Sequence, residues 1–339
     1  MEGKLKYGEN PHQKATFRTI NADDPLAISK FKRSDGGAFL SDETSWISIT
    51  DLGRLIATAE RFAAAFKKNV GGPPPSLAVI VKHGSPCGAA YGEDPATVVR
   101  SAWLGDPQAA FGGFLLSTFP FTRAVADSIK DANGGRMPFL SVAAPSIEKE
   151  IENYVGTKAN TRYFVSNPAL AEVIKPAIYK ETTSVRDVVL EQDSSQFIPD
   201  FKNLSRHGSA LASGEENRIL ADLSLAFAIC ASSTSNTISI VKNGTLIANA
   251  VGQQKRVGSA KLALALAKEN GHDAAASVAV SDSFFPFPDG LESLAKGGVS
   301  VVFATSGSMR DEDVFNAAER LNITMFTAPD KEGRMFAGH

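Results

Sequence analysis

Two hydrophobic patterns alternate along the chain. Short continuous apolar runs, of which LAVIV at 77–81 is the clearest, are typical of strands that are buried on both faces of a sheet. Between them lie segments whose apolar residues recur at helical spacing, as in the stretch after Thr50. This alternation predicts an α/β fold made of layers. We predict strands at 77–81, 114–116, 139–144, 237–241, 245–250, 277–280, 299–304 and 323–327, and helices from Thr50 to about 70 and at 95–103, 123–132, 146–154, 218–231, 261–268, 290–296 and 313–321.

The pattern is interrupted once, by the polar segment 181–214, which we interpret as a linker or peripheral excursion. The alternation of strands and helices restarts after it. A chain of 339 residues is long enough for two domains. We therefore predict two similar α/β halves, 1–200 and 201–339.

The densest candidate chemistry lies at 81–88, in the stretch VKHGSPCG. The preceding apolar run predicts a strand of a parallel sheet that ends in a cation and an imidazole, Lys82 and His83. Ser85 and Pro86 suit the start of a helix. Ligands of α/β proteins bind at the carboxyl ends of strands, so this stretch is a candidate site. The alternative is a lysine at a strand end, a hydrogen-bonded core histidine and an ordinary helix cap.

Four further polar clusters fall in loops or at strand ends: 235–236, 252–256, 281–289 and 306–311. The turn at 252–256 can bind an anion through backbone N–H groups and Arg256, or it can be a solvated turn. The aromatic and proline-rich loop 281–289 can stack on a flat heteroaromatic ligand, or it can fold onto the core. Because strand ends gather on one rim of a sheet, we expect these clusters to lie together.

Composition excludes several classes. The net charge of −2, without a basic run, argues against a nucleic-acid partner. The sequence has no apolar run of membrane-spanning length and no signal-peptide pattern, so we expect a cytoplasmic protein without a membrane partner. Cys87 and Cys230 make no disulfide framework. Cys87 lacks the second cysteine and His83 the following Glu of a zinc deaminase, so we expect no catalytic metal. A Walker-type phosphate loop is also missing.

The same clusters carry a family resemblance. The matching stretches are LKYGENPHQ (5–13), VKHGSPCGAA (81–90), AFGG (110–113), LEQD (190–193), SNTISIVKNG (235–244), GQQKRVGSAK (252–261), SDSFFPFPDG (281–290), SGSMRD (306–311) and RMFAGH (334–339). In this order the chain resembles 5-aminoimidazole-4-carboxamide ribonucleotide (AICAR) transformylase, the formyltransferase part of the bifunctional purine-synthesis enzyme.

The resemblance implies two cytidine-deaminase-like α/β halves without zinc, and a homodimer with shared active sites. It implies AICAR as substrate and 10-formyltetrahydrofolate as cosubstrate. By motif, the catalytic residues are Lys82, His83 and Asn236. The implied substrate-binding residues are Lys6, Tyr7, Gly112, Arg256, Phe284, Asp289, Arg334 and His339, and the implied folate-binding residues are Phe111, Pro286 and Phe287.

The sequence departs from the family pattern at several positions. Pro288 replaces the usual arginine of the aromatic loop, Thr234 replaces a lysine before Ser-Asn, and Leu140 replaces an acidic residue. Gly338 places the final histidine one residue further from Arg334. The cyclohydrolase half that normally precedes Leu5 is absent, so we expect no cyclohydrolase activity.

The expected reaction needs a base and an oxyanion donor. The attacking amine must lose a proton, a role for His83. The tetrahedral intermediate gains negative charge on oxygen, which Lys82 and Asn236 can stabilise. Two alternatives stay open. One is a catalytically silent binder of purine ribonucleotides or folates, and the other is a related transfer with a different amino-nucleotide or one-carbon donor.

Overall fold

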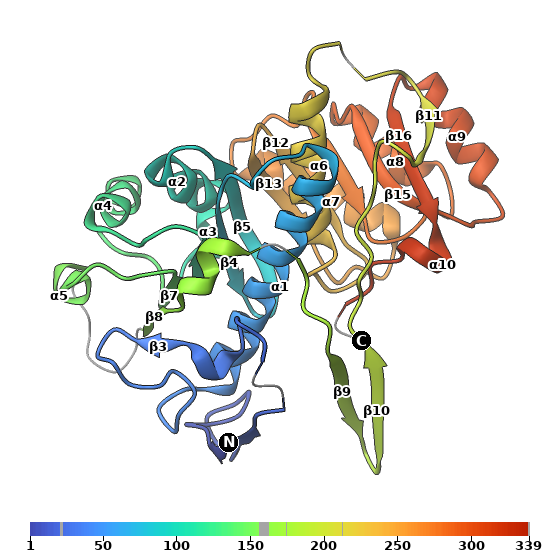
Figure 1. The fold of residues 1–339 in the computed structure, drawn as a ribbon. Helices are drawn as coiled ribbons and strands as arrows, with labels where there is room; N and C mark the ends of the chain where they lie inside the picture. The colour runs from blue at the N-terminus through green and yellow to red at the C-terminus, as the bar shows by residue number, and fades with distance from the viewer. Residues whose placement is uncertain (21–22, 156–162, 174, 212, 338–339) are drawn as a thin grey trace.

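The computed structural model describes residues 1–20, 23–155, 163–173, 175–211 and 213–337. Twelve of the described strands form one mixed sheet in the order β11-β16-β15-β14-β12-β13-β5-β4-β6-β7-β8-β3 (Figure 1). The strands are β3 (Lys32–Arg33), β4 (Ser76–Lys82), β5 (Ser85–Gly92), β6 (Phe114–Ser117), β7 (Ser141–Ala144), β8 (Tyr163–Ser166), β11 (Ser205–Gly208), β12 (Ile238–Lys242), β13 (Thr245–Ala250), β14 (Val278–Ser281), β15 (Val301–Ser306) and β16 (Thr324–Pro329). The predicted α/β class is confirmed.

The two halves of this sheet repeat one strand order. In the first half, β4 and β5 form a hairpin, β6 pairs antiparallel with β4, and β7 and β8 follow in parallel. In the second half, β12 and β13 form the hairpin, β14 pairs antiparallel with β12, and β15 and β16 follow in parallel. The halves meet where β13 pairs antiparallel with β5. The division into domains at 200 and 201 stays a prediction.

Helices cover both faces of the sheet. They are α1 (Trp46–Asn69), α2 (Pro95–Gly105), α3 (Pro107–Ala110), α4 (Arg123–Ala132), α5 (Ile151–Val155), α6 (Glu216–Cys230), α7 (Arg256–Glu269), α8 (Asp289–Lys296), α9 (Asp311–Arg320) and α10 (Asp330–Gly333). On one face α1 packs against α6 (Figure 1). On the other face α2 packs with α4 over the first half, and α7 packs with α8 over the second.

The alternation of side chains along β4 explains its apolar run. Val79 and Val81 enter the core that α1 and α6 cover, whereas Ala78 and Ile80 enter the core beneath α2 and α4. A strand buried on both faces needs apolar residues at every position. The prediction of a parallel strand here is wrong, since β4 is antiparallel to both of its neighbours. Burial on both faces, rather than parallel pairing, produces the continuous run.

The predicted helix start at Ser85 and Pro86 is also wrong, because these residues begin β5. His83 and Gly84 both have positive φ, 53° and 76°, and form a two-residue hairpin turn. Turns with two such residues have the twist that joins antiparallel strands. Pro86 is tolerated beside a break in the register between Ile80 and Val81, since a proline fits a strand at an irregularity.

Most other predicted elements are present with shifted ends. The first helix begins at Trp46 rather than near Thr50, because Ser45 caps it by accepting a hydrogen bond from the backbone N–H of Ser48 at 3.2 Å. The predicted helix at 146–154 is shorter, as α5, and α7 begins at Arg256, ahead of the predicted start. No described helix is long and apolar enough to cross a bilayer.

The segment 181–214 is only partly peripheral, because Phe201 is buried in the core and β11 forms an edge strand of the main sheet. β9 (Lys180–Val185) and β10 (Val188–Asp193) form a hairpin that projects from the body (Figure 1). It pairs with no other described strand. The N-terminal region adds the small pair β1 (Glu2–Lys4) and β2 (Thr16–Arg18), and two 3-10 turns lie at Ile28–Lys30 and Pro168–Glu172.

Candidate active site

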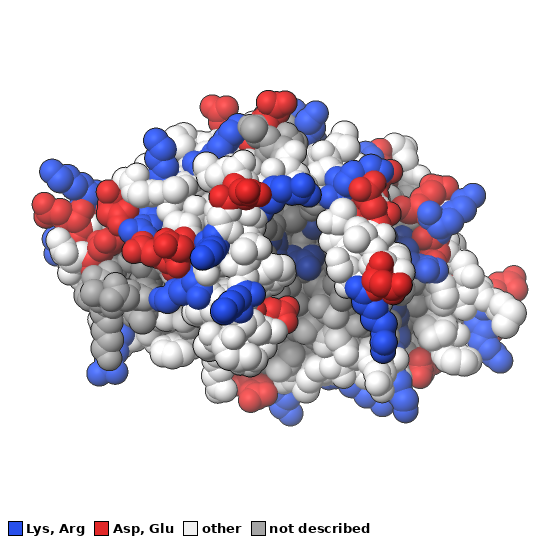
Figure 2. All heavy atoms as spheres, turned by 90° about the horizontal axis from the view of Figure 1, so that it is seen from below, with Lys and Arg blue, Asp and Glu red and all other residues white. Residues whose placement is uncertain are grey.

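Strand directions bring the predicted clusters to one end of the sheet, which we call the rim. Val81, next to the Lys82–Ser85 turn, pairs with Phe114, which follows the Phe111–Gly113 segment. Ile238, which follows Asn236, pairs with both Ala250 and Ser281, so 252–256 and 281–289 start there too. Asn249 joins the halves, because its Nδ2 donates to the carbonyl of Pro86 at 2.7 Å. The face seen from below is hollowed near its middle, with Lys and Arg side chains around the hollow (Figure 2).

The β4–β5 turn presents the first two candidates. Lys82 donates from Nζ to the backbone carbonyl of Phe111 at 2.7 Å. His83 is exposed at the tip of the turn. The N–H of Gly84 donates to Oδ1 of the buried Asp51 at 3.0 Å, which anchors the turn to α1. Burial raises the pKa of Asp51, while the N–H of Gly84 and the charge of His83 oppose that rise. The anchor therefore holds the imidazole outward at the rim.

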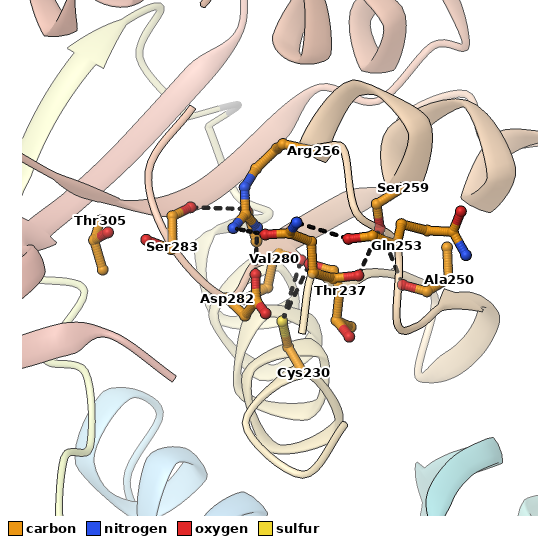
Figure 3. A network of polar contacts seen from close by, with 12 residues as sticks. Cys230, Thr237, Ala250, Gln253, Arg256, Ser259, Val280, Asp282, Ser283 and Thr305 are labelled. Carbon is orange, nitrogen blue, oxygen red and sulfur yellow. Dashed lines mark hydrogen bonds and ion pairs between the residues drawn. The ribbon is translucent and has the colours of Figure 1, made fainter. Parts of the chain in front are cut away.

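A second group is buried in the other half (Figure 3). Arg256, the first residue of α7, forms an ion pair with Oδ1 of Asp282 and donates to Oγ of Ser281 at 2.8 Å. Its other terminal nitrogen donates to Oδ1 of Asn236. The Nδ2 of Asn236 donates to the carbonyl of Gln253 at 2.7 Å. The amide of Asn236 is thus held from both ends, and three N–H groups of Arg256 are engaged within the chain.

The aromatic loop 281–289 is divided between the core and the solvent. Phe285 is fully buried and packs close to Gly290, so the loop does fold onto the core. Phe287 is 52% exposed, with the guanidinium of Arg310 5.4 Å from its ring centre, and Pro286 is exposed as well. Phe284 is half-buried, and Asp289 begins α8.

Phe111 is the corresponding exposed aromatic of the first half. It is 59% exposed, although it lies beside the buried start of β6. Gly112 follows it with a φ of 77°, and the exposed Leu140 lies next to this glycine. Two large aromatic side chains, Phe111 and Phe287, therefore stand in solvent at the rim. Exposed apolar groups gathered at one place usually bind something.

The C-terminal segment crosses the second half of the rim. The N–H of Met335 donates to the carbonyl of Asp282 at 2.9 Å, and Arg334 pairs with Asp330. Burial raises the pKa of the Asp330 carboxyl, but hydrogen bonds from Arg334, Thr305 and Ser283 outweigh it and leave that pKa lowered. His339 lies outside the described residues.

Lys6 and Tyr7 lie beside the start of α1. The N–H of Lys6 donates to the carbonyl of Thr44 at 3.0 Å, and the carbonyl of Tyr7 accepts from the N–H of Trp46 at 3.1 Å. No hydrogen bond among the described residues joins either of them to Lys82 or Asn236.

The sequence analysis missed two carboxylates. It gave no role to Asp282, although this residue lies within the aromatic cluster, and it did not single out Asp51. Their one sequence signal is an acidic residue within an otherwise apolar neighbourhood, since a buried carboxylate needs a partner. Among the described residues no group of three or more His, Cys, Asp or Glu side chains is placed to hold a metal ion. A cavity of about 300 Å³ between α6, β11 and β16 contains none of the predicted site residues.

Comparison with known proteins gives a consistent result. The family model described as the AICARFT/IMPCHase bienzyme matches residues 1–266. The chain is 31% identical over 327 residues to the bifunctional purine biosynthesis protein PurH of Prochlorococcus marinus (strain NATL2A), covering 96% of this chain and 58% of that protein. It is 32% identical over 335 residues to PurH of Thermotoga maritima, covering 97% and 62%. PurH of Bacillus cereus (strain G9842) is 31% identical over 322 residues, covering 95% and 57%. The chain thus spans about three fifths of the length of these curated relatives.

Proposed function

Because the chain belongs to the AICARFT/IMPCHase bienzyme family, we propose that its rim transfers the formyl group of 10-formyltetrahydrofolate to the 5-amino group of AICAR in purine biosynthesis. One observation carries this proposal. The Lys82–His83 turn and Asn236 come from different halves of the chain, yet strand directions bring them to the same end of the sheet. The proposed chemistry ends at the formylated ribonucleotide.

In the proposed step, the 5-amino nitrogen attacks the formyl carbon, and a C–N bond forms. His83 accepts the proton that this nitrogen loses and returns it to N10 of the folate as the old C–N bond breaks. Lys82 and Asn236 stabilise the negative charge on the tetrahedral oxygen. An ammonium has three N–H donors, and Lys82 uses one on Phe111. Asn236 keeps one amide N–H beyond its bond to Gln253.

The exposed rings supply a surface for the folate. We place its flat pterin against Phe111, Pro286 and Phe287, since aromatic rings favour stacked contacts. We place AICAR among the substrate-binding residues named above. Arg256 can contribute only the N–H groups that Asp282, Ser281 and Asn236 leave free. The departures at Leu140, Thr234 and Pro288 fall where these ligands would lie.

The test is direct. Purified protein is incubated with AICAR and 10-formyltetrahydrofolate, and release of tetrahydrofolate is followed spectroscopically. We expect turnover that survives dialysis against a strong chelator, because the sequence lacks the second cysteine and the His-x-Glu of the zinc deaminases. Tight AICAR binding without turnover would instead identify a silent nucleotide binder. Zinc that is stoichiometric and needed for turnover would contradict metal independence.

We further propose that the active form is a homodimer with shared sites. The β9–β10 hairpin supports this, because it exposes Val185, Val188, Val189 and Leu190 to solvent in a single copy. A two-stranded hairpin that packs against nothing is marginally stable in water, so a second copy of the chain is the covering surface we infer.

Sedimentation tests the dimer. Wild type should sediment at twice the chain mass of 35.9 kDa, and the double substitution Val189→Asp/Leu190→Asp should shift it towards monomer and lower turnover. Leu104→Asp, at an exposed apolar residue of α2, is the matched control. A monomeric wild type with full turnover would end this part of the proposal.

A further inference from the structure

Asp282 is a fully buried carboxylate with an incomplete set of partners. Its exposed fraction is 0%. Oδ1 pairs with Arg256, whereas Oδ2 has no hydrogen-bond partner in the described structure. The backbone is fixed on both sides, because its N–H donates to Thr237 at 3.3 Å and its carbonyl accepts from Met335 at 2.9 Å. A buried acceptor without a partner destabilises a fold, so the carboxylate is poorly explained by stability alone.

Arg256, which lies beside Asp282 in Figure 3, also donates a hydrogen bond to Asn236. A guanidinium only donates hydrogen bonds, so the atom of Asn236 that faces Arg256 must be Oδ1. A backbone carbonyl only accepts, so the atom that faces Gln253 must be Nδ2. The two contacts fix which way the amide is turned. They also fix the direction of the one N–H that remains.

We propose that Asp282 is a positioning residue that orients the amide of Asn236 through Arg256. The proposal rests on the formyl-transfer function for its consequence, since the oriented N–H is the one assigned to the tetrahedral oxygen. A lone guanidinium buried without a carboxylate turns towards water or draws in another anion. Asp282 holds it in place, and Asn236 then has a single orientation. Asp282 itself does not need to touch a substrate.

A double-mutant cycle tests the link. Asp282→Asn keeps the size of the side chain and removes its charge. We expect it to lower kcat roughly tenfold to a hundredfold, with a much smaller change in AICAR affinity, because an oxyanion donor acts mainly in the transition state. In an Asn236→Ala background the same change should lower kcat by less than about twofold, since residues that act through one group are not additive. An equal loss in both backgrounds, or no loss in either, would refute the link.

Asp222→Asn is the matched control. Asp222 is also fully buried and pairs with an arginine, Arg218, at 3.2 Å, but it lies at the opposite end of the second-half hairpin. The Asp222→Asn substitution should lower the melting temperature and leave kcat of the folded enzyme unchanged. If Asp282→Asn fails to fold, Asp282→Glu keeps the buried charge, displaces the carboxylate from Arg256 and allows the same comparison.

A second measurement does not depend on turnover. The side-chain amide resonances of Asn236 are identified as those lost in Asn236→Ala and are recorded without substrates. They should shift in Asp282→Asn, or in Asp282→Glu, and stay in place in Asp222→Asn. If they shift while wild type transfers no formyl group, the proposed function is wrong and the positioning link stands. If they do not shift, the link is wrong whatever the activity.

Discussion

The two hairpin turns of the sheet have one geometry and different surroundings. In the first, His83 and Gly84 have φ values of 53° and 76°, and in the second, Asn243 and Gly244 have 49° and 77°. A lysine precedes each turn, and the strand register breaks at the same place before each. A buried aspartate on the helix above, Asp51 or Asp222, accepts from the turn. The repetition shows that both halves of the sheet use the same turn geometry.

The two turns differ in the hydrogen bonds and ion pairs around them. Asp222 accepts from both turn N–H groups, at 3.0 Å from Asn243 and 2.7 Å from Gly244, and also from the hydroxyl of Tyr91 at 2.8 Å. Lys242 donates to the carbonyl of Asp273 at 2.8 Å and pairs with its carboxylate at 3.5 Å.

At the first turn only Gly84 is bonded to the helix aspartate, and the ammonium of Lys82 meets a carbonyl instead of a carboxylate. At the second turn the lysine is paired with a carboxylate and both turn N–H groups are bonded. At the first turn the ammonium of Lys82 contacts a carbonyl and His83 is exposed.

Exchanging the tip residues should give the largest difference. His83→Asn installs the residue of the second turn, which tolerates positive φ, so the melting temperature should hold. The rate of formyl transfer should fall by roughly 10²–10⁴, the range for a lost acid–base group. Asn243→His should leave the rate unchanged. Kinetics and thermal melts on the same samples check this. A normal rate of formyl transfer in His83→Asn would show that the two turns do not differ in catalysis.

The preceding lysines should differ almost as much. Lys82→Ala should lower kcat by roughly 10²–10³, the range for a lost oxyanion donor. Lys242→Ala breaks a surface pair, so kcat should hold and the free energy of unfolding should change by less than about 1 kcal/mol. Steady-state kinetics and urea unfolding separate the two. Equal losses of kcat in the two variants would show that Lys82 and Lys242 do not differ in their effect on catalysis, although only Lys242 pairs with the carboxylate of Asp273.

The two helices that anchor the turns, α1 and α6, should contribute differently to the pH dependence of stability. Burial raises the pKa of Glu60, on α1, from 4.5 to about 7, against a hydrogen bond from Ala177. Glu60 lies nine residues after Asp51, and the residue nine after Asp222 is Ala231, which follows the end of α6 and does not titrate. Native Glu60 keeps its proton where the unfolded chain has lost it. The contribution of Glu60 to the free energy of unfolding should therefore be greatest below pH 4.5. It should fall, by up to about 3 kcal/mol, as the pH rises to about 7.

Glu60→Gln isolates this contribution. The variant cannot ionise at this position, so the difference in stability between it and wild type should change across that window and level off above it. Urea unfolding of both proteins at a series of pH values measures the difference. A constant difference would show that Glu60 does not titrate in this range.

The two anchoring aspartates, Asp222 and Asp51, should differ least. Asp222→Asn removes an acceptor from the turn and should lower the free energy of unfolding by about 1–3 kcal/mol, the cost of leaving buried donors unmatched. Asp51→Asn keeps one oxygen that can accept from Gly84, the single turn N–H that Asp51 binds, so its cost should be less. Urea unfolding of both variants checks which substitution lowers the free energy of unfolding more.

Local sequence signals explain what could be predicted. Asn243-Gly244 is a strong hairpin signal, and the second hairpin was predicted correctly. His83-Gly84 is not such a signal, and Ser85-Pro86 imitates a helix start, so the first hairpin was missed. The apolar runs predicted most strands correctly, because helices cover both faces of the sheet and its strands are therefore apolar along their whole length.

The contacts that shape the site could not be predicted in this way. Asp51 meets Gly84, and Asp282 meets Arg256, only after distant strands and helices have packed. Periodicity places a residue on an element but does not choose its partner. The grouping of the polar clusters at one rim was predicted, since that follows from the α/β layering. The roles of individual residues there stay predictions.

The pairing of β5 with β13 matters for the nascent chain. The first half leaves the ribosome before β13 exists, so the outer edge of β5 is briefly a row of unpaired backbone groups, open to any other strand. The sequence of β5, SPCGAAYG, is a poor template for such pairing, since proline and glycine weaken strand association. The same Ser85-Pro86 step that resembles a helix start thus helps to keep an unfinished chain from aggregating.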